Sequence, residues 1–517
     1  MITAPERAAD EAAGEIVVRA PSSGAELGRV PVLGGAQVRA ALAAARAAQP
    51  AWAALPVRER ARRLTAFRRL LAEHARDIAG ISSAETGKLP FEAMMVDVLT
   101  TCDLAAWYAK RADTVLSPRR TPAGWLITKK AWIEREPYGV VAVIGPWNFP
   151  VLNTMRAVMA GIVAGNAVLL KPSELTPLSA LAVQRLAREA GVPEAVFQVL
   201  TGDGGTGRAL VEAGVDKISF TGSVETGRAI ARAAADRLIP VTLELGGKDP
   251  VLVTEGADVR RAARTAVNGA FWNAGQICIS IERAYVVDAV YDEFIEEALR
   301  ATRALRVGTP EDADADVGAM TTAAQTFHVE RQVRDAIERG ARVLAGGERA
   351  PGGRAWLPTL LVDVTHDMDV MRSETFGPVL PVMRVRDADE AVRLANDSGF
   401  ALGASVWGPE GDARRLAGRL RAGMVCINDA LVNGTIASLP FGGAGESGYG
   451  RVYGDEGLRE LSRPRALLAD RAGLGWEPGL FPLRRFGLPR ALGLVRALHG
   501  RGVVQRVRGL LSLLRGK

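Results

Sequence analysis

The segment AVLLKPSELTPLSALAVQRLAREAGVPEAVFQVL, residues 167–200, contains two short apolar runs separated by a helical pattern. The runs are Ala167 to Leu170 and Val196 to Leu200, and the helical pattern covers roughly Leu178 to Ala190. A strand, a helix and a second strand in this order are typical of a right-handed crossover unit in a parallel sheet. The segment therefore predicts an α/β fold.

Two further apolar runs of the same kind flank this segment. Val140 to Ile144 precedes it and Lys217 to Phe220 follows it, with helical patterns at Thr206 to Ala213 and Thr226 to Ala235. In open parallel sheets, ligands bind beyond the carboxyl ends of the strands. The residues directly after each run are therefore the first candidates for a functional site.

The rest of the chain predicts further units. Strands and helices alternate from Val251 to about Ile427, which indicates a second α/β unit. We place the boundary between the units near Leu245 to Pro250, where two consecutive glycines interrupt the pattern. The stretch Val38 to Ala79 predicts two amphipathic helices, and Trp125 to Glu136 is compatible with a β-hairpin.

The composition indicates a globular protein. The 517-residue chain is 48% hydrophobic and 24% charged, and its length suggests two or three cores. Three widely spaced cysteines favour a reducing compartment over a disulfide framework and show no metal-site spacing. The N-terminus has no signal-peptide core, and no run reaches the ~18 apolar residues of a membrane span. We expect a cytoplasmic protein.

The net charge of +7 resides almost entirely in the C-terminal tail. Residues 466–517 contain ten basic residues and only two acidic ones, so the rest of the chain is close to neutral. A nucleic-acid-binding protein would carry its basic residues on the folded body. The charge distribution therefore argues against nucleic acid as a partner.

Several polar residues follow the predicted strands. Asn148 lies in the rigid turn after Ile144, where its amide could stabilise an oxyanion or merely satisfy the turn backbone. Lys171 and Glu174 follow the next strand. They could bind ribose hydroxyls, and Glu174 would repel a 2′-phosphate, although a surface ion pair is the alternative.

The turn TGSVETG, residues 221–227, links a predicted strand to a predicted helix. Gly222, Ser223 and Gly227 could let backbone N–H groups at the helix N-terminus face a pyrophosphate. The turn does not match the GxGxxG fingerprint, and any strand-to-helix turn can use glycine. Alone it is a weak signal.

A carboxylate and a thiol complete the candidate set. Glu244 lies between two leucines beside a glycine pair, a setting that suits a general base, although a capping or salt-bridged role is equally compatible. Cys278 follows a predicted helix, Val259 to Phe271, in the polar, glycine-containing stretch NAGQICIS; the alternative is a small buried hydrophobe. The four histidines lie outside every such segment, so Glu244 is the better partner for a cysteine nucleophile.

Taken together and in this order, these segments resemble the aldehyde dehydrogenase family over roughly residues 20 to 465. The matching segments are PWNFP (146–150), KPSE (171–174), FTGSVETG (220–227), LELGG (243–247), GQIC (275–278), ETFGP (374–378) and PFGG (440–443). One such motif is weak, but seven in the family's order are strong.

The resemblance implies a chemical mechanism and a cofactor. Cys278 would attack the aldehyde carbon, Asn148 would hold the oxyanion, and Glu244 would activate the water that hydrolyses the thioester. Because CoA-acylating relatives commonly lack this base, the hydrolytic form is favoured. The residues implied for NAD, with NADP as the alternative, are Trp147, Lys171, Glu174, Gly222, Ser223, Gly227, Glu374 and Phe376; no metal is implied.

The resemblance also implies an architecture. Residues 1–245 would form a Rossmann-like cofactor-binding domain and residues 246–430 an α/β catalytic domain. A β-hairpin arm at about residues 120–137 and the stretch 431–465, which would return to the cofactor domain, would mediate a homodimer or homotetramer.

The substrate is left with two candidates. Arg156, eight residues after Asn148, falls where succinate-semialdehyde dehydrogenases carry an arginine for the substrate carboxylate; the alternative is a surface arginine on a helix. A hydrophobic, medium- or long-chain aldehyde is the favoured substrate. A function of another class, a non-catalytic scaffold or binding protein, would fit better if Cys278 or Glu244 were missing.

The tail, residues 466–517, departs from the family pattern. Its apolar residues repeat at helical spacing with arginines largely on other faces, a pattern that suits a helix in an anionic membrane interface. Some long-chain aldehyde dehydrogenases carry such C-terminal extensions. The alternative is a helix pair that packs on the protein body or at an oligomer contact.

Overall fold

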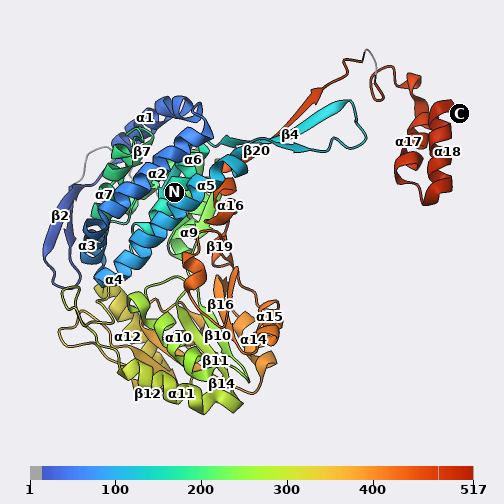
Figure 1. Ribbon diagram of the computed structural model, residues 1–517. Coiled ribbons are helices and arrows are strands. Elements are labelled where there is room, and N and C mark those ends of the chain that lie inside the picture. Colours follow the sequence, from blue (N-terminus) through green and yellow to red (C-terminus); the bar gives the residue numbers. More distant parts are fainter. Residues whose placement is uncertain (1–13, 475–476, 516–517) are drawn as a thin grey trace, which may run out of the picture. The chain divides into compact units, whose positions relative to one another are not determined.

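The computed structural model describes residues 14–474 and 477–515 and contains two compact units (Figure 1). One unit takes its described residues from Met1–Leu116 and Glu136–Arg463, and the other from Ser117–Arg135 and Pro464–Lys517. The first unit contains two large sheets. The predicted boundary between a cofactor domain and a catalytic domain near residues 245–250 falls within this unit and stays a prediction.

The first large sheet has six strands in the order β19-β9-β8-β5-β6-β7. Its strands are β5 (Val140–Ile144), β6 (Ala167–Lys171), β7 (Phe197–Val199), β8 (Lys217–Thr221), β9 (Val241–Glu244) and β19 (Gly448–Tyr449). The first five are parallel, and β19 pairs antiparallel with β9. The crossover helices are α6 (Leu152–Ala164), α7 (Pro177–Glu189), α8 (Gly204–Glu212) and α9 (Val224–Ala235).

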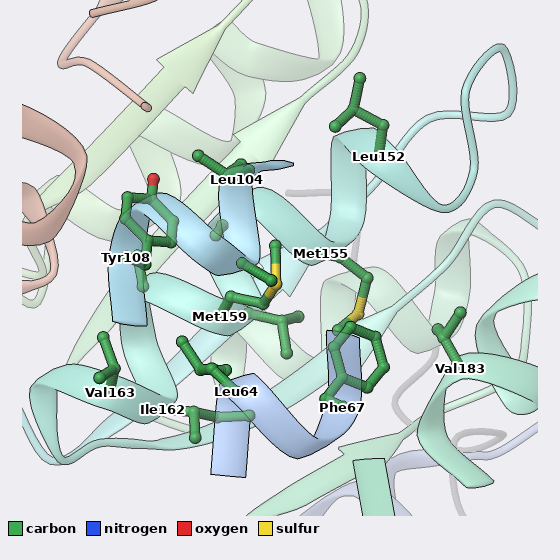
Figure 2. Close-up of a cluster of buried hydrophobic side chains, with 14 of the residues drawn as sticks. Leu64, Phe67, Leu104, Tyr108, Leu152, Met155, Met159, Ile162, Val163 and Val183 are labelled. Carbon is green, nitrogen blue, oxygen red and sulfur yellow. The ribbon is translucent and has the colours of Figure 1, made fainter. Parts of the chain in front are cut away.

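Both faces of this sheet are buried, which explains its uninterrupted apolar strands. Along β5, Val141 and Val143 belong to one core, whereas Val140 and Ala142 belong to another. Alternate side chains of a strand point to opposite faces, so a strand covered on both sides must be apolar throughout. The larger of these two cores is built from helices, and the labelled side chains in Figure 2 come from α6, α7, α2 (Val57–Glu73) and α5 (Thr101–Leu116).

The register of the strands aligns their carboxyl ends. Ile144 pairs with both Lys171 and Phe220, and Thr221 pairs with Glu244. The residues that directly follow β5, β6, β8 and β9 therefore share one edge of the sheet, as the sequence predicted.

The second large sheet has seven strands in the order β12-β13-β14-β11-β10-β16-β17. They are β10 (Asp249–Val253), β11 (Ile281–Val287), β12 (Arg342–Ala345), β13 (Thr359–Val362), β14 (Val379–Val385), β16 (Gly403–Trp407) and β17 (Met424–Ile427). Only β12 runs antiparallel to its neighbour. The helices of this part are α10 (Val259–Phe271), α11 (Asp288–Arg303), α12 (Ala323–Glu338), α13 (Asp369–Arg372), α14 (Ala388–Asn396) and α15 (Glu410–Ala417), and a third core lies between them and the sheet.

The N-terminal part corrects one prediction. Val38 to Ala79 was expected to form two helices, but three are present: α1 (Gly35–Ala53), α2 and α3 (Ala75–Thr86). His74 breaks the pattern because its backbone, at φ −97° and ψ 21°, is not helical. Apolar periodicity continues across this single residue, so it could not reveal the break. A two-stranded sheet, β1 (Glu15–Arg19) with β2 (Glu26–Pro31), precedes these helices.

A short π-helix lies between α3 and α5. After α4 (Pro90–Glu92), the segment η1 (Ala93–Thr100) adopts the wider π-helical turn. Such turns are rare and often occur at functional sites, because they change the direction of the side chains that follow.

The second unit consists of strands and a pair of helices. The stretch Trp125 to Glu136 does not itself form a hairpin, because it contains only β4 (Lys129–Pro137); β4 pairs with the preceding strand β3 (Arg119–Thr121), in agreement with an arm at about 120–137, and also with β20 (Ser462–Asp470). Lys129 forms ion pairs with Asp470 and Glu477. The chain ends in α17 (Gly487–His499) and α18 (Gly502–Arg515), and no helix in the described residues is long and apolar enough to cross a membrane.

Candidate active site

The cysteine predicted as nucleophile lies in a loop with unusual backbone conformation. The loop follows α10, whose bounds match the predicted helix, and leads into β11. Asn273, Ala274 and Gly275 have φ values of 52°, 51° and 72°, and a Cβ atom at Gly275 would collide with the backbone of Gly377. Left-handed non-glycine residues cost free energy and cluster at functional sites. The loop therefore holds Cys278 in one defined position.

Asn148 contacts this loop directly. Its Nδ2 donates to the carbonyl oxygen of Gln276 at 2.9 Å, and its Oδ1 accepts from Nδ2 of Asn153 at 3.1 Å. The side chain is buried, so its orientation is set by these two bonds. Asn148, on the turn that follows β5, is thus bonded to the backbone of Gln276, two residues before Cys278 in the loop that carries the thiol.

A buried ion pair supports the Asn148 turn. Lys88 Nζ donates to Asp97 Oδ2 at 2.8 Å and to the Asn148 carbonyl oxygen at 2.6 Å, and both side chains are fully buried. Asp97 Oδ1 accepts from the backbone N–H groups of Val151 and Leu152. The pair therefore joins the loop after α3, the π-helix η1 and the turn after β5.

Glu244, the last residue of β9, is a buried carboxylate without a direct partner. Neither of its oxygens has a hydrogen-bond partner among the residues that the structure describes. Burial raises the pKa of this carboxyl to about 8, against the opposing effects of Arg156 and Arg451. A carboxyl with a pKa near neutrality and free lone pairs has the properties of a general base.

The Cys278 thiol lies in a similarly dry setting. Its side chain is half-buried, and desolvation raises its pKa to about 12, while the charge of Arg156 opposes that rise. Glu244 and Glu374 also act on the thiol electrostatically, so both carboxylates lie within range of it. The thiol and the two carboxylates therefore belong to one electrostatic group.

Arg156 is buried, so the alternative of a surface arginine is wrong. Its Nη2 donates to Thr221 Oγ1 at 3.1 Å, it is hydrogen-bonded to Tyr453, and its guanidinium lies 4.9 Å from the centre of the Phe441 ring. Its Nε has no partner among the described residues. Residue 156 lies on α6, which is buried along its whole length, and helical periodicity cannot reveal such burial.

Cys278 and Arg156 line a common cavity of about 330 Å³. The wall is mostly apolar; its apolar members are Met95, Val96, Leu99, Phe149, Leu152, Trp272, Ile277, Ile279, Ala430, Leu431, Val432, Phe441 and Tyr453. Met95, Leu99 and Val432 are exposed. The cavity thus connects an apolar rim on the surface with the thiol, and the π-helix η1 supplies three of its apolar residues.

The residues predicted for an adenosine and pyrophosphate lie along the carboxyl edge of the first sheet. Lys171 Nζ is 3.3 Å from Glu174 Oε2; the lysine is buried and the glutamate is half exposed, so this is not a freely solvated ion pair. Ser223 is the N-cap of α9, where its Oγ accepts from the Thr226 N–H. Gly227 packs against Leu245, leaving no room for a side chain.

The residues predicted for the nicotinamide end are brought together from distant segments. The Trp147 and Phe376 rings meet edge to face with their centres 5.5 Å apart. Glu374 Oε1 accepts from the Gly247 N–H at 3.1 Å, and burial raises the pKa of Glu374 to about 8. Phe376 has φ 49°, so the 374–376 loop is also held in a left-handed turn.

These donors and surfaces fit a nicotinamide dinucleotide. The edge offers ribose-binding donor and acceptor groups at Lys171 and Glu174, a helix N-terminus at Ser223, and an aromatic pair at Trp147 and Phe376. The edge lies beyond the carboxyl ends of parallel strands, where dinucleotides bind in doubly wound sheets.

The comparisons with known proteins agree with this geometry. A model described as the aldehyde dehydrogenase family matches residues 8–467, nearly the whole chain. The chain belongs to the aldehyde dehydrogenase family.

Relatives of this aldehyde dehydrogenase include proteins with different named substrates. A 4,4'-diapolycopene aldehyde oxidase from Methylomonas sp is 42% identical over 94% of this chain and 91% of its own. The crystal structure of a succinate-semialdehyde dehydrogenase from Burkholderia pseudomallei matches with 35% identity and a TM-score of 0.85, over 88% of this chain and 95% of that chain. An NAD-dependent aldehyde dehydrogenase from Sinorhizobium meliloti matches with 36% identity and a TM-score of 0.86, over 90% and 93%.

The predicted fold class and enzyme class of this aldehyde dehydrogenase are confirmed by these matches. The roles predicted for individual residues are not tested by them and stay predictions. The structure adds four residues that sequence reasoning missed: Lys88, Asp97, Lys248 and Glu282, two buried ion pairs. The sequence offered one signal for these pairs, the rarity of lysine, since only eight of the 65 basic residues are lysines. The structure buries four of these eight.

Proposed function

We propose that this aldehyde dehydrogenase oxidises a hydrophobic aldehyde to the carboxylic acid, with NAD as oxidant and Cys278 as nucleophile. The observation that carries the proposal is a largely apolar cavity whose wall contains the Cys278 thiol and Arg156, with the Asn148 amide bonded to the loop that carries the thiol. An apolar pocket with a few convergent polar groups is the usual form of a small-molecule site.

The first step is attack of the thiolate sulfur on the aldehyde carbon. The thiol needs a base because its pKa is raised to about 12, and Glu244 in its charged form can accept the proton. The positive charge of Arg156 favours the thiolate. The new C–S bond forms as the carbonyl π electrons move to oxygen, and Asn148 Nδ2 and the Cys278 N–H are the donors for that oxyanion.

When bound, NAD accepts the hydride that the tetrahedral adduct loses, which leaves a thioester on Cys278. Glu244 releases the thiol's proton to solvent and then takes a proton from a water molecule, whose oxygen attacks the thioester carbon. The C–S bond breaks, the carboxylic acid leaves, and the cysteine sulfur recovers its proton. The oxygens of Glu244 support this role because no donor among the described residues occupies them.

The half-exposed Glu174 supports NAD over NADP. A 2′-phosphate would bring its negative charge to the carboxylate that pairs with Lys171. NAD is also the cofactor named for the relative from Sinorhizobium meliloti. NADP is the alternative.

The apolar wall of the cavity supports a medium- or long-chain aldehyde. Such a substrate gains roughly 0.8 kcal/mol for each buried methylene group. The relative named for an apolar polyene aldehyde, 4,4'-diapolycopene aldehyde, points to the same class. Arg156 favours a second candidate, a semialdehyde such as succinate semialdehyde, because it lines the cavity and its buried Nε has no hydrogen-bond partner among the described residues.

Three further proposals concern the whole protein. The hairpin β3–β4 with β20 would serve as the arm of a homodimer or homotetramer, and residues 246–430 would form the catalytic domain. The three cysteines are unpaired, which supports the cytoplasm as the location.

The decisive experiment measures NADH formation with hexanal, decanal and succinate semialdehyde. We expect turnover of decanal, its loss in Cys278→Ser, and near-normal turnover in the matched control Cys102→Ser, whose thiol lies outside the cavity. Turnover of succinate semialdehyde alone, lost in Arg156→Ala, would favour the second candidate. No turnover of any aldehyde, with the protein folded, would favour a non-catalytic scaffold.

A further inference from the structure

The two C-terminal helices pack against each other through glycine. A Cβ atom at Gly493 of α17 would lie 2.9 Å from the Gly509 carbonyl oxygen and 2.7 Å from the Leu513 nitrogen. Gly509 of α18 faces the backbone of Arg496 and Ala497 just as closely. Glycine on each helix thus lets the two backbones approach directly, and few large side chains lie between them.

The large apolar side chains of both helices point outward instead. Those exposed are Leu488, Leu492, Val495 and Leu498 of α17 and Val503, Val504, Val507, Leu510, Leu511 and Leu514 of α18. Leu488 is 82% exposed and Leu514 is 77% exposed. A helix pair in water normally buries its apolar stripe in the contact between the helices. In this pair the apolar side chains lie on the outer surface, so we expect an apolar partner to contact that surface.

The charge of the C-terminal segment indicates which partner contacts the exposed apolar side chains of α17 and α18. The sequence contains no acidic residue after Glu477, whereas eight arginines follow it. A second copy of this tail would carry the same positive charge and repel the first. The remainder of the chain is close to neutral, so it carries no net negative charge to attract the tail. An apolar surface ringed by arginines is complementary to an anionic lipid bilayer.

The length of the helices restricts how they meet a bilayer. α17 has 13 residues and α18 has 14, so each is about 20 Å long at the ~1.5 Å rise of an α-helix. The hydrocarbon core of a bilayer is about 30 Å thick. Neither helix can cross it, and no other helix of the described residues is long and apolar enough to do so.

We propose that α17 and α18 form a membrane-docking surface that lies in the headgroup region of an anionic bilayer. The outward leucines and valines would contact the acyl chains, and the arginines would contact lipid phosphates. The segment lies beyond residue 467, where the match to the family model ends, so the surface is an addition to the family's catalytic body. The proposal is independent of the chemistry at Cys278.

The test is co-sedimentation of the full chain with vesicles. Pure phosphatidylcholine vesicles are compared with vesicles that contain phosphatidylglycerol, at low and high salt. We expect at least roughly tenfold more bound protein on the anionic vesicles at low salt, because each arginine near the surface adds about 1 kcal/mol. Equal binding to both kinds of vesicle, or to neither, would overturn the proposal.

Two variants separate lipid contact from other causes. The double change Val495→Asp with Leu510→Asp alters only outward side chains and is expected to reduce vesicle binding roughly tenfold or more. The matched control is Leu238→Asp, an exposed leucine of the catalytic body, and it should bind like the parent. Arg496→Gln with Arg508→Gln should weaken binding and reduce its salt dependence.

Light scattering and decanal turnover distinguish membrane docking from dimerisation and from loss of enzyme activity. Light scattering without vesicles tests whether a second copy of the chain covers the apolar surface of α17 and α18. If the parent protein is a dimer that the double change dissociates, and it does not bind vesicles, the lipid proposal is overturned. Decanal turnover without vesicles should be unchanged in all three variants, because none alters a residue of the cavity wall. A failure of the proposed dehydrogenase function and a failure of membrane docking are therefore distinguishable.

Discussion

Lys248 donates through Nζ to Glu282 Oε2 at 2.7 Å, and both side chains are almost completely buried. Glu282 also accepts from the backbone N–H groups of Thr375 at 2.7 Å and Phe376 at 2.8 Å. One ion pair thus joins the segment after Glu244 to the turn that carries Glu374 and Phe376. The two residues contact no predicted substrate atom, but they determine where the nicotinamide end of the site lies.

Replacement of this carboxylate should affect both stability and cofactor binding. Glu282→Gln leaves the Lys248 charge buried without a counter-charge, a change that costs about 3 to 5 kcal/mol in typical proteins. We expect a clear loss of thermal stability and a higher KM for NAD. The control is Glu296→Gln, which removes an exposed ion pair to Arg300 and should cost less than about 1 kcal/mol. Unchanged NAD binding would contradict the role assigned to the pair.

Removal of the amide donor should slow chemistry without affecting the nucleophile. For Asn148→Ala we expect kcat to fall by about 10² to 10³, the usual effect of losing one oxyanion donor. The rate at which iodoacetamide alkylates Cys278 should stay within about twofold, because alkylation forms no oxyanion. A parallel loss of both rates would mean that Asn148 only shapes the loop through its bond to Gln276.

The sequence predicted the edge of the first sheet well and its supports poorly. Asn148, Lys171 and Ser223 follow predicted apolar strands, so strand patterns alone placed them at one edge, whereas the strand β9 that ends in Glu244 was not predicted. The ion pair Lys88–Asp97 escaped prediction because a buried charge looks like a surface charge until its partner is known.

The contact between the two C-terminal helices and the environment of Arg156 were also not predictable from the sequence. Helical spacing predicted both C-terminal helices, but not that Gly493 and Gly509 would form their contact. That contact depends on how close two backbones approach, which periodicity does not encode. Arg156 was assigned either to a substrate or to the surface, whereas the structure places it among buried groups of its own protein.

The charge of Arg156 should control the reactivity of the thiol. For Arg156→Met we expect slower iodoacetamide alkylation of Cys278, because the opposing effect of the cation on the raised thiol pKa is lost. Each unit of pKa changes the thiolate fraction about tenfold. Arg156→Lys should recover part of the rate. If Cys278 is equally reactive in the parent, in Arg156→Met and in Arg156→Lys, the charge of Arg156 does not influence the pKa of the thiol.

The choice of cofactor should depend on Glu174. For Glu174→Ser we expect kcat/KM with NADP to rise roughly tenfold while the value with NAD falls modestly, because the repulsion of the 2′-phosphate is removed and one ribose acceptor is lost. The control is Glu189→Ser at the exposed end of α7. If the ratio of the two cofactor efficiencies does not move, the adenosine ribose binds elsewhere.

Glu244 should make both activity and stability depend on pH. Its carboxyl has a pKa of about 8 in the folded protein against an ordinary value of 4.5, because burial disfavours the charged form. The folded state therefore keeps a proton that the unfolded state has released, so this group lowers stability as pH rises through that window, and the full cost is present above about pH 8. Thioester hydrolysis should run in the opposite direction and increase until the carboxylate is formed.

Glu244→Gln tests both consequences in one protein. We expect the variant to be more stable than the parent by a few kcal/mol at about pH 9 and by little at about pH 5, since each pKa unit corresponds to about 1.4 kcal/mol. Both thiol attack and thioester hydrolysis use Glu244 as the base, so NADH formation by the variant should be slow from the first turnover. Glu410→Gln on the exposed start of α15 serves as the control and should differ from the parent equally at both pH values. A stability difference for Glu244→Gln that does not grow with pH would mean that this carboxyl is already charged at low pH.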